Sequence, residues 1–177
     1  INAGPCSGGV DSWFATIQGK GGHGAYPHTT VDPFFLLAHV IIALNGIVSR
    51  RLDPFAPAVV SIGSIHGGFT ENVIPDSIKI TGTMRFTTSE TQKQIHDEMK
   101  RAFEVAKALG GDYELKIEIG APPMINDEFV SKVMEEAGKD LLGAENVQEM
   151  HKSLGAEDFG SFMAHAPGAM YTIGVQK

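Results

Sequence analysis

One histidine of this chain stands in a glycine-rich segment, Gly19-Lys-Gly-Gly-His-Gly-Ala-Tyr-Pro-His28, whose residues have few side-chain atoms. Glycine lets a backbone approach a ligand closely. An alternating pattern from Trp13 to Gln18 predicts a strand before the segment, and Asp32-Pro33 after it suits a helix N-cap and first turn. His23 is therefore expected at a junction between elements, where functional groups often lie, and we favour a functional role for it over a purely structural one.

The same segment also matches Gly19-x-Gly21-x-x-Gly24, the spacing of a dinucleotide-binding loop. That loop must open directly into a helix, whose N-terminus holds the pyrophosphate. Here Pro27 and Pro33 delay the helix, and the position where an acidic ribose ligand is expected falls in Ala43-Leu44-Asn45. The sequence therefore disfavours a dinucleotide site.

Two further polar side chains suit ligand binding. Asn72 lies in a loop predicted to join the two central hairpin strands, although a turn-stabilising asparagine is equally expected there. Arg85 lies at the end of the polar face of a predicted strand, where a solvated or salt-bridged arginine is the commoner outcome. With His23, they provide an imidazole, an amide and a guanidinium, which suit a substrate that has a carbonyl and a carboxylate.

A self-sufficient catalytic set is missing from the sequence. It contains no His-Glu-x-x-His, Gly-x-Ser-x-Gly or P-loop lysine motif. No two of its seven histidines are spaced i,i+4 on one predicted helix face, so we expect no local zinc site. His39 and His96 fall inside predicted helices and are expected to be structural. Cys6, the only cysteine, excludes an intrachain disulfide and is expected to be inert.

Composition restricts the partners of the chain. Its net charge is −7, its pI is about 5.4, and its basic residues are scattered, which argues against nucleic acid and anionic membranes. The most apolar run, residues 34–44, is shorter than a bilayer span and contains His39. These features predict a cytoplasmic protein without a membrane partner. The first residues lack an initiator methionine and begin in a loop, so we expect a fragment of a longer chain.

Changes in hydrophobic period predict a βαββαβ order within residues 10–119. The predicted elements cover residues 11–18, 33–50, 58–66, 78–86, 89–109 and 113–119. The second helix opens on Ser89-x-x-Gln92, a capping-box pattern, and ends at Gly110-Gly111. This order predicts an α+β, ferredoxin-like fold, with a four-stranded antiparallel sheet and both helices on one face.

The character of the sequence changes beyond residue 120. A third helix over about Glu128 to Leu142, a Gly155-Ala-Glu-Asp-Phe-Gly160 turn and a short strand from Met170 to Gly174 are predicted. These pieces bury too little surface to offset the loss of chain entropy on their own. We therefore expect them to belong to a neighbouring, incomplete α/β domain.

Five motifs of the chain occur together in a specific order. They are Gly-Lys-Gly-Gly-His-Gly-Ala-x-Pro-His, Asp32-Pro33, Gly68-x-x-x-Asn72-Val-Ile-Pro-Asp76, Gly82-Thr-x-Arg85 and Gly155-x-Glu-Asp-Phe159. The combination resembles the N-acyl-amino-acid amidohydrolases. This group contains hippurate hydrolases, indoleacetyl-amino-acid hydrolases and thermostable carboxypeptidases, within the dinuclear zinc aminopeptidase and aminoacylase family.

The resemblance implies a homodimeric enzyme whose βαββαβ lid is inserted into a catalytic domain. By this resemblance, residues 1–9 are an incoming linker, 10–119 the lid and dimerisation domain, and 120–177 part of the catalytic domain. Two divalent metal ions, expected to be zinc, would lie in the intact parent. The family's metal ligands and catalytic glutamate lie outside this chain, so no metal is expected on it.

The resemblance also implies roles for individual residues. His23 would reach the partner subunit's site and polarise the scissile carbonyl, while Asn72 and Arg85 would bind the substrate carboxylate. Gly155 and Glu157 would line the site. The expected function of the parent is hydrolysis of an amide next to a free carboxylate in a small N-acyl amino acid or peptide, and the isolated chain is expected to be inactive. The alternative is a stand-alone βαββαβ dimerisation or ligand-binding module without catalysis.

Overall fold

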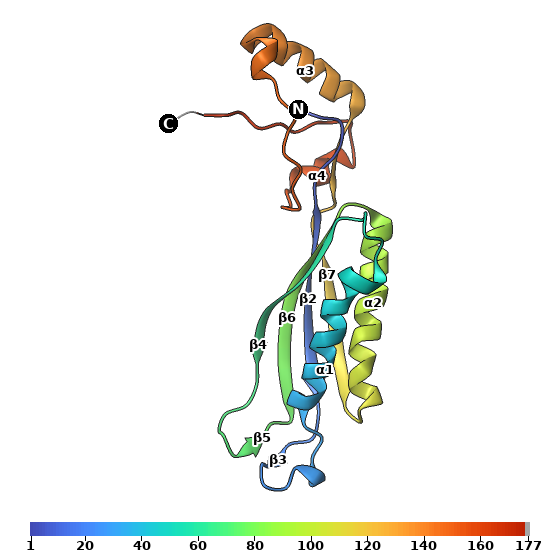
Figure 1. The fold of residues 1–177 in the computed structure, drawn as a ribbon, viewed down its shortest axis with the longest axis vertical. Helices are drawn as coiled ribbons and strands as arrows, with labels where there is room; N and C mark the ends of the chain where they lie inside the picture. The colour runs from blue at the N-terminus through green and yellow to red at the C-terminus, as the bar shows by residue number, and fades with distance from the viewer. Residues whose placement is uncertain (176–177) are drawn as a thin grey trace.

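The computed structural model describes residues 1–175 (Figure 1). They form a long part, which we call the lid, and a smaller segment joined to it by two stretches of chain. The lid, Gly9 to Ile119, is a four-stranded antiparallel sheet in the order β4-β6-β2-β7, as the sequence predicted. Its strands are β2 (Gly9–Gln18), β4 (Ala58–His66), β6 (Ser77–Phe86) and β7 (Asp112–Ile119). The loop that contains Asn72 joins β4 to β6, the central hairpin of the βαββαβ order, as the sequence predicted, and β4 lies at the edge of the sheet.

The core forms between one face of this sheet and two helices, α1 (Pro33–Gly46) and α2 (Ser89–Ala108). Alternate residues of β2 and β6 point into it, as their sequence period requires. Trp13 is fully buried and meets Phe103 of α2 edge to face, with ring centroids 6.0 Å apart. Each fully buried large apolar side chain contributes about 1.5–3 kcal/mol, so this layer stabilises the lid.

The first helix continues without a break into a π-helical turn, η2 (Ile47–Arg51). The combined 19 residues agree with the helix predicted over 33–50 and are long and apolar enough to cross a bilayer by length and composition alone, whereas the sequence analysis considered only the apolar run 34–44 for a span. However, Leu36, Val40 and Leu44 on one side are buried in the lid core. The helix is apolar because it packs against the sheet and α2.

The N-cap of the second helix lies one residue before the predicted one. Thr88, in extended conformation, accepts a hydrogen bond from the Thr91 backbone N–H at 3.1 Å, so Thr88 and not Ser89 is the N-cap. The two threonine hydroxyls also lie 3.1 Å apart. A side chain caps a helix only from an extended backbone, which Ser89 lacks because it is already helical.

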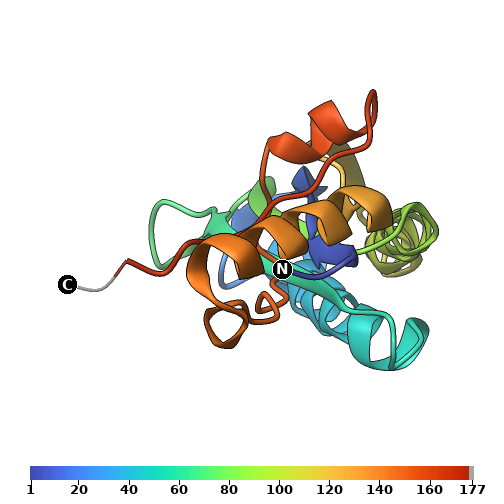
Figure 2. The ribbon, with the colours of Figure 1, turned by 90° about the horizontal axis from the view of Figure 1, so that it is seen from above.

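The smaller segment lies beyond one end of the sheet. Seen from that end, α3 lies nearest the viewer and crosses over the lid (Figure 2). It contains β1 (Gly4–Ser7), β8 (Met124–Asn126), α3 (Glu128–Leu142), η3 (Ala144–Asn146) and α4 (Phe159–Met163). The strand predicted at Met170–Gly174 was wrong, since these residues are irregular. Only the Met170 backbone is held, by the buried Asn126 amide. Apolar side chains of α3 such as Phe129 and Leu141 are exposed.

Candidate functional site

The tip of the lid is formed by two loops that pair with each other. Strand β3 (Gly22–His23) lies antiparallel to β5 (Val73–Ile74), with His23 opposite Val73. The Gly24 amide also donates to the Asn72 carbonyl at 2.8 Å. The pairing brings His23 and Asn72 to one place, although the sequence analysis placed both in separate loops (Figure 1).

The glycines around His23 serve this pairing. A Cβ atom at Gly21 would lie 2.6 Å from the Ile74 carbonyl oxygen, and one at Gly24 would lie 3.1 Å from the Asn72 carbonyl oxygen. The close approach they permit is therefore to the opposite loop, whereas the sequence analysis assigned it to a ligand. Because a strand follows Gly21, the segment also lacks the helix that a dinucleotide loop needs.

The His23 imidazole is exposed and has a defined donor atom. Its Nδ1 accepts a hydrogen bond from the Ala25 backbone N–H at 3.1 Å. A neutral imidazole that accepts at Nδ1 carries its proton on Nε2, so Nε2 is the free donor. The ring lies 5.6 Å from that of Tyr26. Asn72 is likewise exposed, and its Oδ1 accepts from Thr70 Oγ1 at 3.4 Å.

Arg85 lies at the opposite end of the sheet. It is paired with Val10 of β2 and Val59 of β4, eight residues after Ser77 at the tip end of β6. At about 3.3 Å per residue, β6 runs roughly 26 Å from Ser77 to Arg85, and the tip lies beyond Ser77. Because β6 separates Asn72 from Arg85 within one chain, the prediction that both bind one substrate carboxylate requires residues from two chains.

Gly155 and Glu157 lie at the same end of the lid as Arg85. The Gly8 amide donates to the Gly155 carbonyl at 3.1 Å, and the Ser7 hydroxyl donates to the same oxygen. Both predicted residues line a hollow of about 200 Å³ together with Cys6. Burial raises the pKa of the Cys6 thiol, so it remains protonated at neutral pH. The five predicted residues thus form two groups, at the tip and at the other end.

A comparison with known protein families decides the class of the chain. Residues 7–110 match the peptidase dimerisation domain of the M20 group. The chain belongs to this family. Among curated relatives, N-acetyl-L-cysteine deacetylase of Bacillus subtilis is 35% identical over 98% of this chain and 42% of its own length. Thermostable carboxypeptidase 1 of Saccharolobus solfataricus is 34% identical over 98% and 44%. The chain therefore spans less than half the length of these relatives.

Solved structures share the same fold. A crystal structure from methicillin-resistant Staphylococcus aureus superposes with a TM-score of 0.84 at 30% identity, over 94% of this chain and 44% of that one. A dinuclear metal-binding peptidase of the M20 family from Bacillus subtilis superposes with a TM-score of 0.78 at 26% identity, over 96% and 42%. The M20 dimerisation domain and the segment beyond it are thus both shared with these proteins.

Within residues 1–175, no three His, Cys, Asp or Glu side chains come together in a way that would hold an ion.

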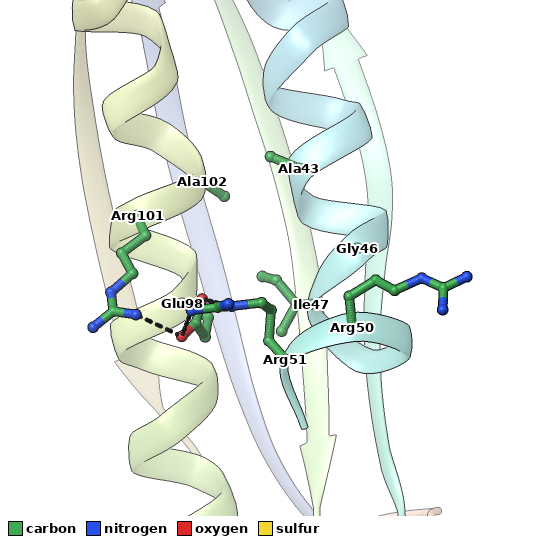
Figure 3. Close-up of a pocket in the computed structure, with 8 residues that line it drawn as sticks. All are labelled: Ala43, Gly46, Ile47, Arg50, Arg51, Glu98, Arg101 and Ala102. Carbon is green, nitrogen blue, oxygen red and sulfur yellow. Dashed lines mark hydrogen bonds and ion pairs between the residues drawn. The ribbon is translucent and has the colours of Figure 1, made fainter. Parts of the chain in front are cut away.

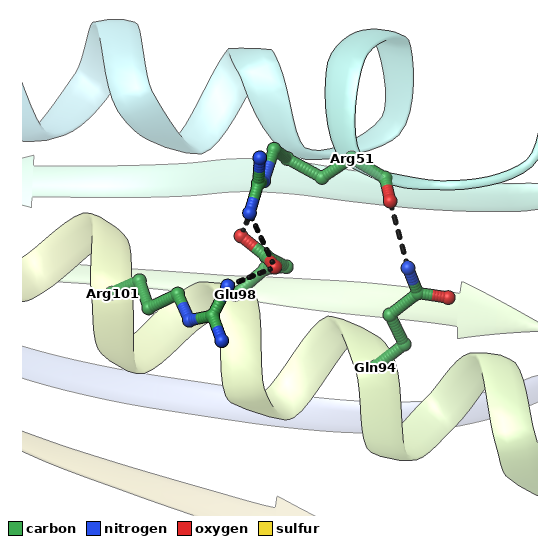
Figure 4. A network of polar contacts seen from close by, with 4 residues as sticks. All are labelled: Arg51, Gln94, Glu98 and Arg101. Carbon is green, nitrogen blue, oxygen red and sulfur yellow. Dashed lines mark hydrogen bonds and ion pairs between the residues drawn. The ribbon is translucent and has the colours of Figure 1, made fainter.

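A second hollow, of about 290 Å³, lies on the helical face of the dimerisation domain between η2 and α2 (Figure 3). Glu98 lies between Arg51 and Arg101, at 2.8 Å and 3.1 Å (Figures 3 and 4). The Arg50 side chain points away from them (Figure 3). Gln94 Nε2 donates to the Arg51 carbonyl at 2.7 Å (Figure 4). This network fastens η2 to α2 through charge-assisted hydrogen bonds.

One charged residue of the dimerisation domain was missed by the sequence analysis. Asp11 is fully buried on the core side of β2, at an inward position of the Asp11, Trp13, Ala15, Ile17 alternation. Burial of a carboxylate is unfavourable unless it is hydrogen-bonded. An aspartate at an inward strand position was therefore a signal, available in the sequence, that several donors surround it. Its partner His96 was correctly expected to be structural.

Proposed function

We propose that this chain is the dimerisation and substrate-orienting part of a metal-dependent amidohydrolase or peptidase. The parent would hydrolyse the amide next to a free carboxylate in a small N-acyl amino acid or peptide. The names of the deacetylase and carboxypeptidase relatives support this reaction class. The observation that carries the proposal is the separation of the polar groups into two half-sites at opposite ends of β6.

A single small substrate cannot contact both half-sites of one chain. The tip half-site, His23 and Asn72, lies beyond the Ser77 end of β6, whereas the half-site of Arg85, Gly155 and Glu157 lies at its other end, roughly 26 Å further along the strand. In a two-fold dimer, each residue of one subunit can meet a different residue of the other. We propose that the tip of one lid completes the Arg85 end of the partner subunit.

The side chains suit distinct parts of such a substrate. Arg85 presents a planar guanidinium that can bind the carboxylate through two parallel hydrogen bonds. The Nε2 proton of His23 would be donated to the scissile carbonyl oxygen, where negative charge develops during attack. The Asn72 amide, at the same tip, would bind the substrate beside His23. The two divalent ions of the parent, which we propose to be zinc, would supply an activated water and be held by residues outside this chain.

The dimer contact is proposed to use the outer side of α1 and the edge strand β4. Ile42 of α1 is 71% exposed, and Phe35 beside it is half exposed. Ile65 of the edge strand β4 is also exposed, and an open edge strand is a ready pairing surface. Ile42→Asp should convert the intact enzyme to a monomer in sedimentation. Leu109→Asp, at an exposed apolar position at the end of α2, should leave the dimer intact.

The composite site is tested by mixing two impaired variants of the intact enzyme, His23→Ala and Arg85→Ala, at a substrate concentration well below the wild-type KM, where each variant alone is nearly inactive. If the tip acts across the dimer, one site of each hybrid receives both an intact His23 and an intact Arg85, so activity returns. If both residues served the site of their own chain, every site would keep one defect. No recovery after verified subunit exchange would reject the cross-subunit site.

The same experiment separates the alternative, a dimerisation or ligand-binding module without catalysis. In that case the intact protein would form dimers through the lid but would hydrolyse none of a panel of N-acetyl and N-benzoyl amino acids or dipeptides. Neither His23→Ala nor Arg85→Ala would then change a measured rate. The exposed Nε2 donor and the Arg85 guanidinium favour the enzyme, because dimerisation alone requires neither group.

A further inference from the structure

A buried carboxylate lies where the lid joins the smaller segment. Asp11 is 0% exposed, and its Oδ2 accepts hydrogen bonds from Gln92 Nε2 at 2.8 Å and from His96 Nε2 at 2.7 Å. Its Oδ1 accepts from the Gly120 backbone N–H at 3.0 Å. Burial of a charged group is unfavourable unless several donors satisfy it, and here three do so.

The three donors come from two parts of the molecule that must keep a fixed relationship. Gln92 and His96 lie on α2, the lid helix that begins at this end of the sheet. Gly120 is the first residue after β7, where the chain leaves the lid. Asp11 itself lies near the start of β2, the strand by which the chain enters. We call residues 8–11 and 119–123 the hinge.

Close backbone contacts surround the carboxylate in the hinge. The Val10 amide donates to the Ala121 carbonyl at 2.9 Å, and the Gly120 amide also donates to the Val10 carbonyl at 3.1 Å. A Cβ atom at Gly120 would lie 2.5 Å from that Val10 oxygen. The Asp11 side chain therefore connects these two neighbouring backbone segments to α2.

We infer that Asp11 is a positioning residue that sets the angle between the lid and the segment that follows it. The inference rests on the proposed function, in which the lid tip must meet a site on the partner subunit. Asp11 does not contact that site. It acts through Gly120 and α2 on the direction in which the two connecting strands leave the lid.

The length of the lid makes this angle important. The tip lies roughly 26 Å from the hinge end of β6, so a rotation of about 5° would displace His23 by about 2 Å. A misplacement of about 1 Å can reduce the rate of an enzyme roughly a hundredfold. A carboxylate shared between helix and exit strand resists such rotation, because any tilt lengthens at least one of three charge-assisted hydrogen bonds.

Core stability alone does not account for the carboxylate. A well-packed apolar side chain often stabilises a buried position as well as a buried charged pair does. The neighbouring inward positions of the same strand, Trp13, Ala15 and Ile17, are apolar. Asp11 is the charged inward position of this strand, and it lies beside Gly120. It binds and orients the Gly120 backbone N–H at the point where the chain leaves the lid.

Amide hydrogen exchange of the intact enzyme tests the inference. Asp11→Asn keeps the size of the side chain but places an N–H group where the α2 donors need an acceptor. In this variant the Val10 and Gly120 amides should exchange about tenfold faster. Amides at the middle of β2 should keep their wild-type rates. His96→Gln provides a second, milder variant at a partly exposed position. Ile17→Val, at the tip end of the same strand, is the matched core control. It should not selectively accelerate amide exchange in the hinge.

Equal acceleration throughout the lid would make Asp11 an ordinary structural residue, and unchanged hinge amides would also overturn the inference. Hydrolysis of a panel of N-acetyl amino acids adds a second readout. A positioning role predicts that His96→Gln lowers kcat about tenfold while KM stays within twofold. If the wild-type enzyme hydrolyses none of the panel, the proposed function fails, whereas the exchange result still decides whether Asp11 holds the hinge.

Discussion

Asn72 and Arg85 lie towards opposite ends of the lid, although only 13 positions of sequence separate them, because β6 runs roughly 26 Å from Ser77 to Arg85. Strand β6 extends from the tip, where β3 and β5 lie, to the end of the lid beside the smaller segment (Figure 1). Two residues that both suit the carboxylate or carbonyl of a substrate are thereby assigned to different half-sites. Their separation is the reason that a second copy of the chain enters the proposed mechanism.

His23 and Arg85 should affect catalysis differently in the intact enzyme. Stabilisation of a developing oxyanion is a transition-state effect, so His23→Ala should lower kcat about a hundredfold to a thousandfold with little change in KM. Arg85→Ala should act mainly on KM, because a carboxylate is bound equally in the ground and transition states. Steady-state kinetics with one N-acyl amino acid measures both. Equal effects of the two variants on kcat alone would contradict the assigned roles.

The cap of α2 provides a prediction with an adjacent control. Thr88→Ala removes the oxygen that accepts the Thr91 N–H and should cost about 1 kcal/mol of unfolding free energy. Ser89→Ala, one residue inside the helix, should change it by less than about 0.5 kcal/mol. Urea denaturation can follow the fluorescence of Trp13, the only tryptophan, which is buried in the lid. A larger loss of unfolding free energy in Ser89→Ala than in Thr88→Ala would show that Ser89 is the cap, as the sequence predicted.

Gly82 should tolerate no side chain. A Cβ atom there would lie 2.0 Å from the Ser61 carbonyl oxygen and 2.4 Å from the Trp13 ring. Gly82→Ala should therefore destabilise the lid by about 3 kcal/mol in the same denaturation experiment. Gly46→Ala is the control, because a Cβ atom at Gly46 meets nothing within 4 Å and alanine favours the helix by about 0.5–1 kcal/mol. Similar stability of the two variants would show that the strands can move apart at Gly82.

The ion pairs of Glu98 should make stability depend on acidity. The hydrogen bond from Arg51 holds the pKa of Glu98 below its usual value, so its contribution is present at neutral pH and is lost as pH falls through that lowered pKa. Glu98→Gln should lower unfolding free energy by about 1 kcal/mol at pH 7, because the pair is partly solvated. The difference from wild type should shrink below about pH 4. Glu136→Gln, on the exposed side of α3, should show no such pH dependence.

Local sequence determined the elements of the lid. The period of two in β2 and β6, the period of 3.6 in α2 and the glycines after it are set by contacts between near neighbours, and these predictions were confirmed. The motif glycine Gly82 could be noticed in the sequence, but its reason lies in Ser61 and Trp13, which come from two other strands. The Thr88 cap was missed by one residue because Thr88 and Ser89 are both suitable capping residues and only the backbone conformation distinguishes them.

Tertiary structure decided which residues share a site. The pairing of β3 with β5 joins His23 to Asn72, while the length of β6 separates both from Arg85. The pairing is not encoded by spacing, because it depends on how segments about 50 residues apart meet. Asp11 was visible as a polar residue on an inward face, yet its donors come from α2 and from the exit of β7. A carboxylate is stabilised only by the donors that surround it, and only the fold assembles them.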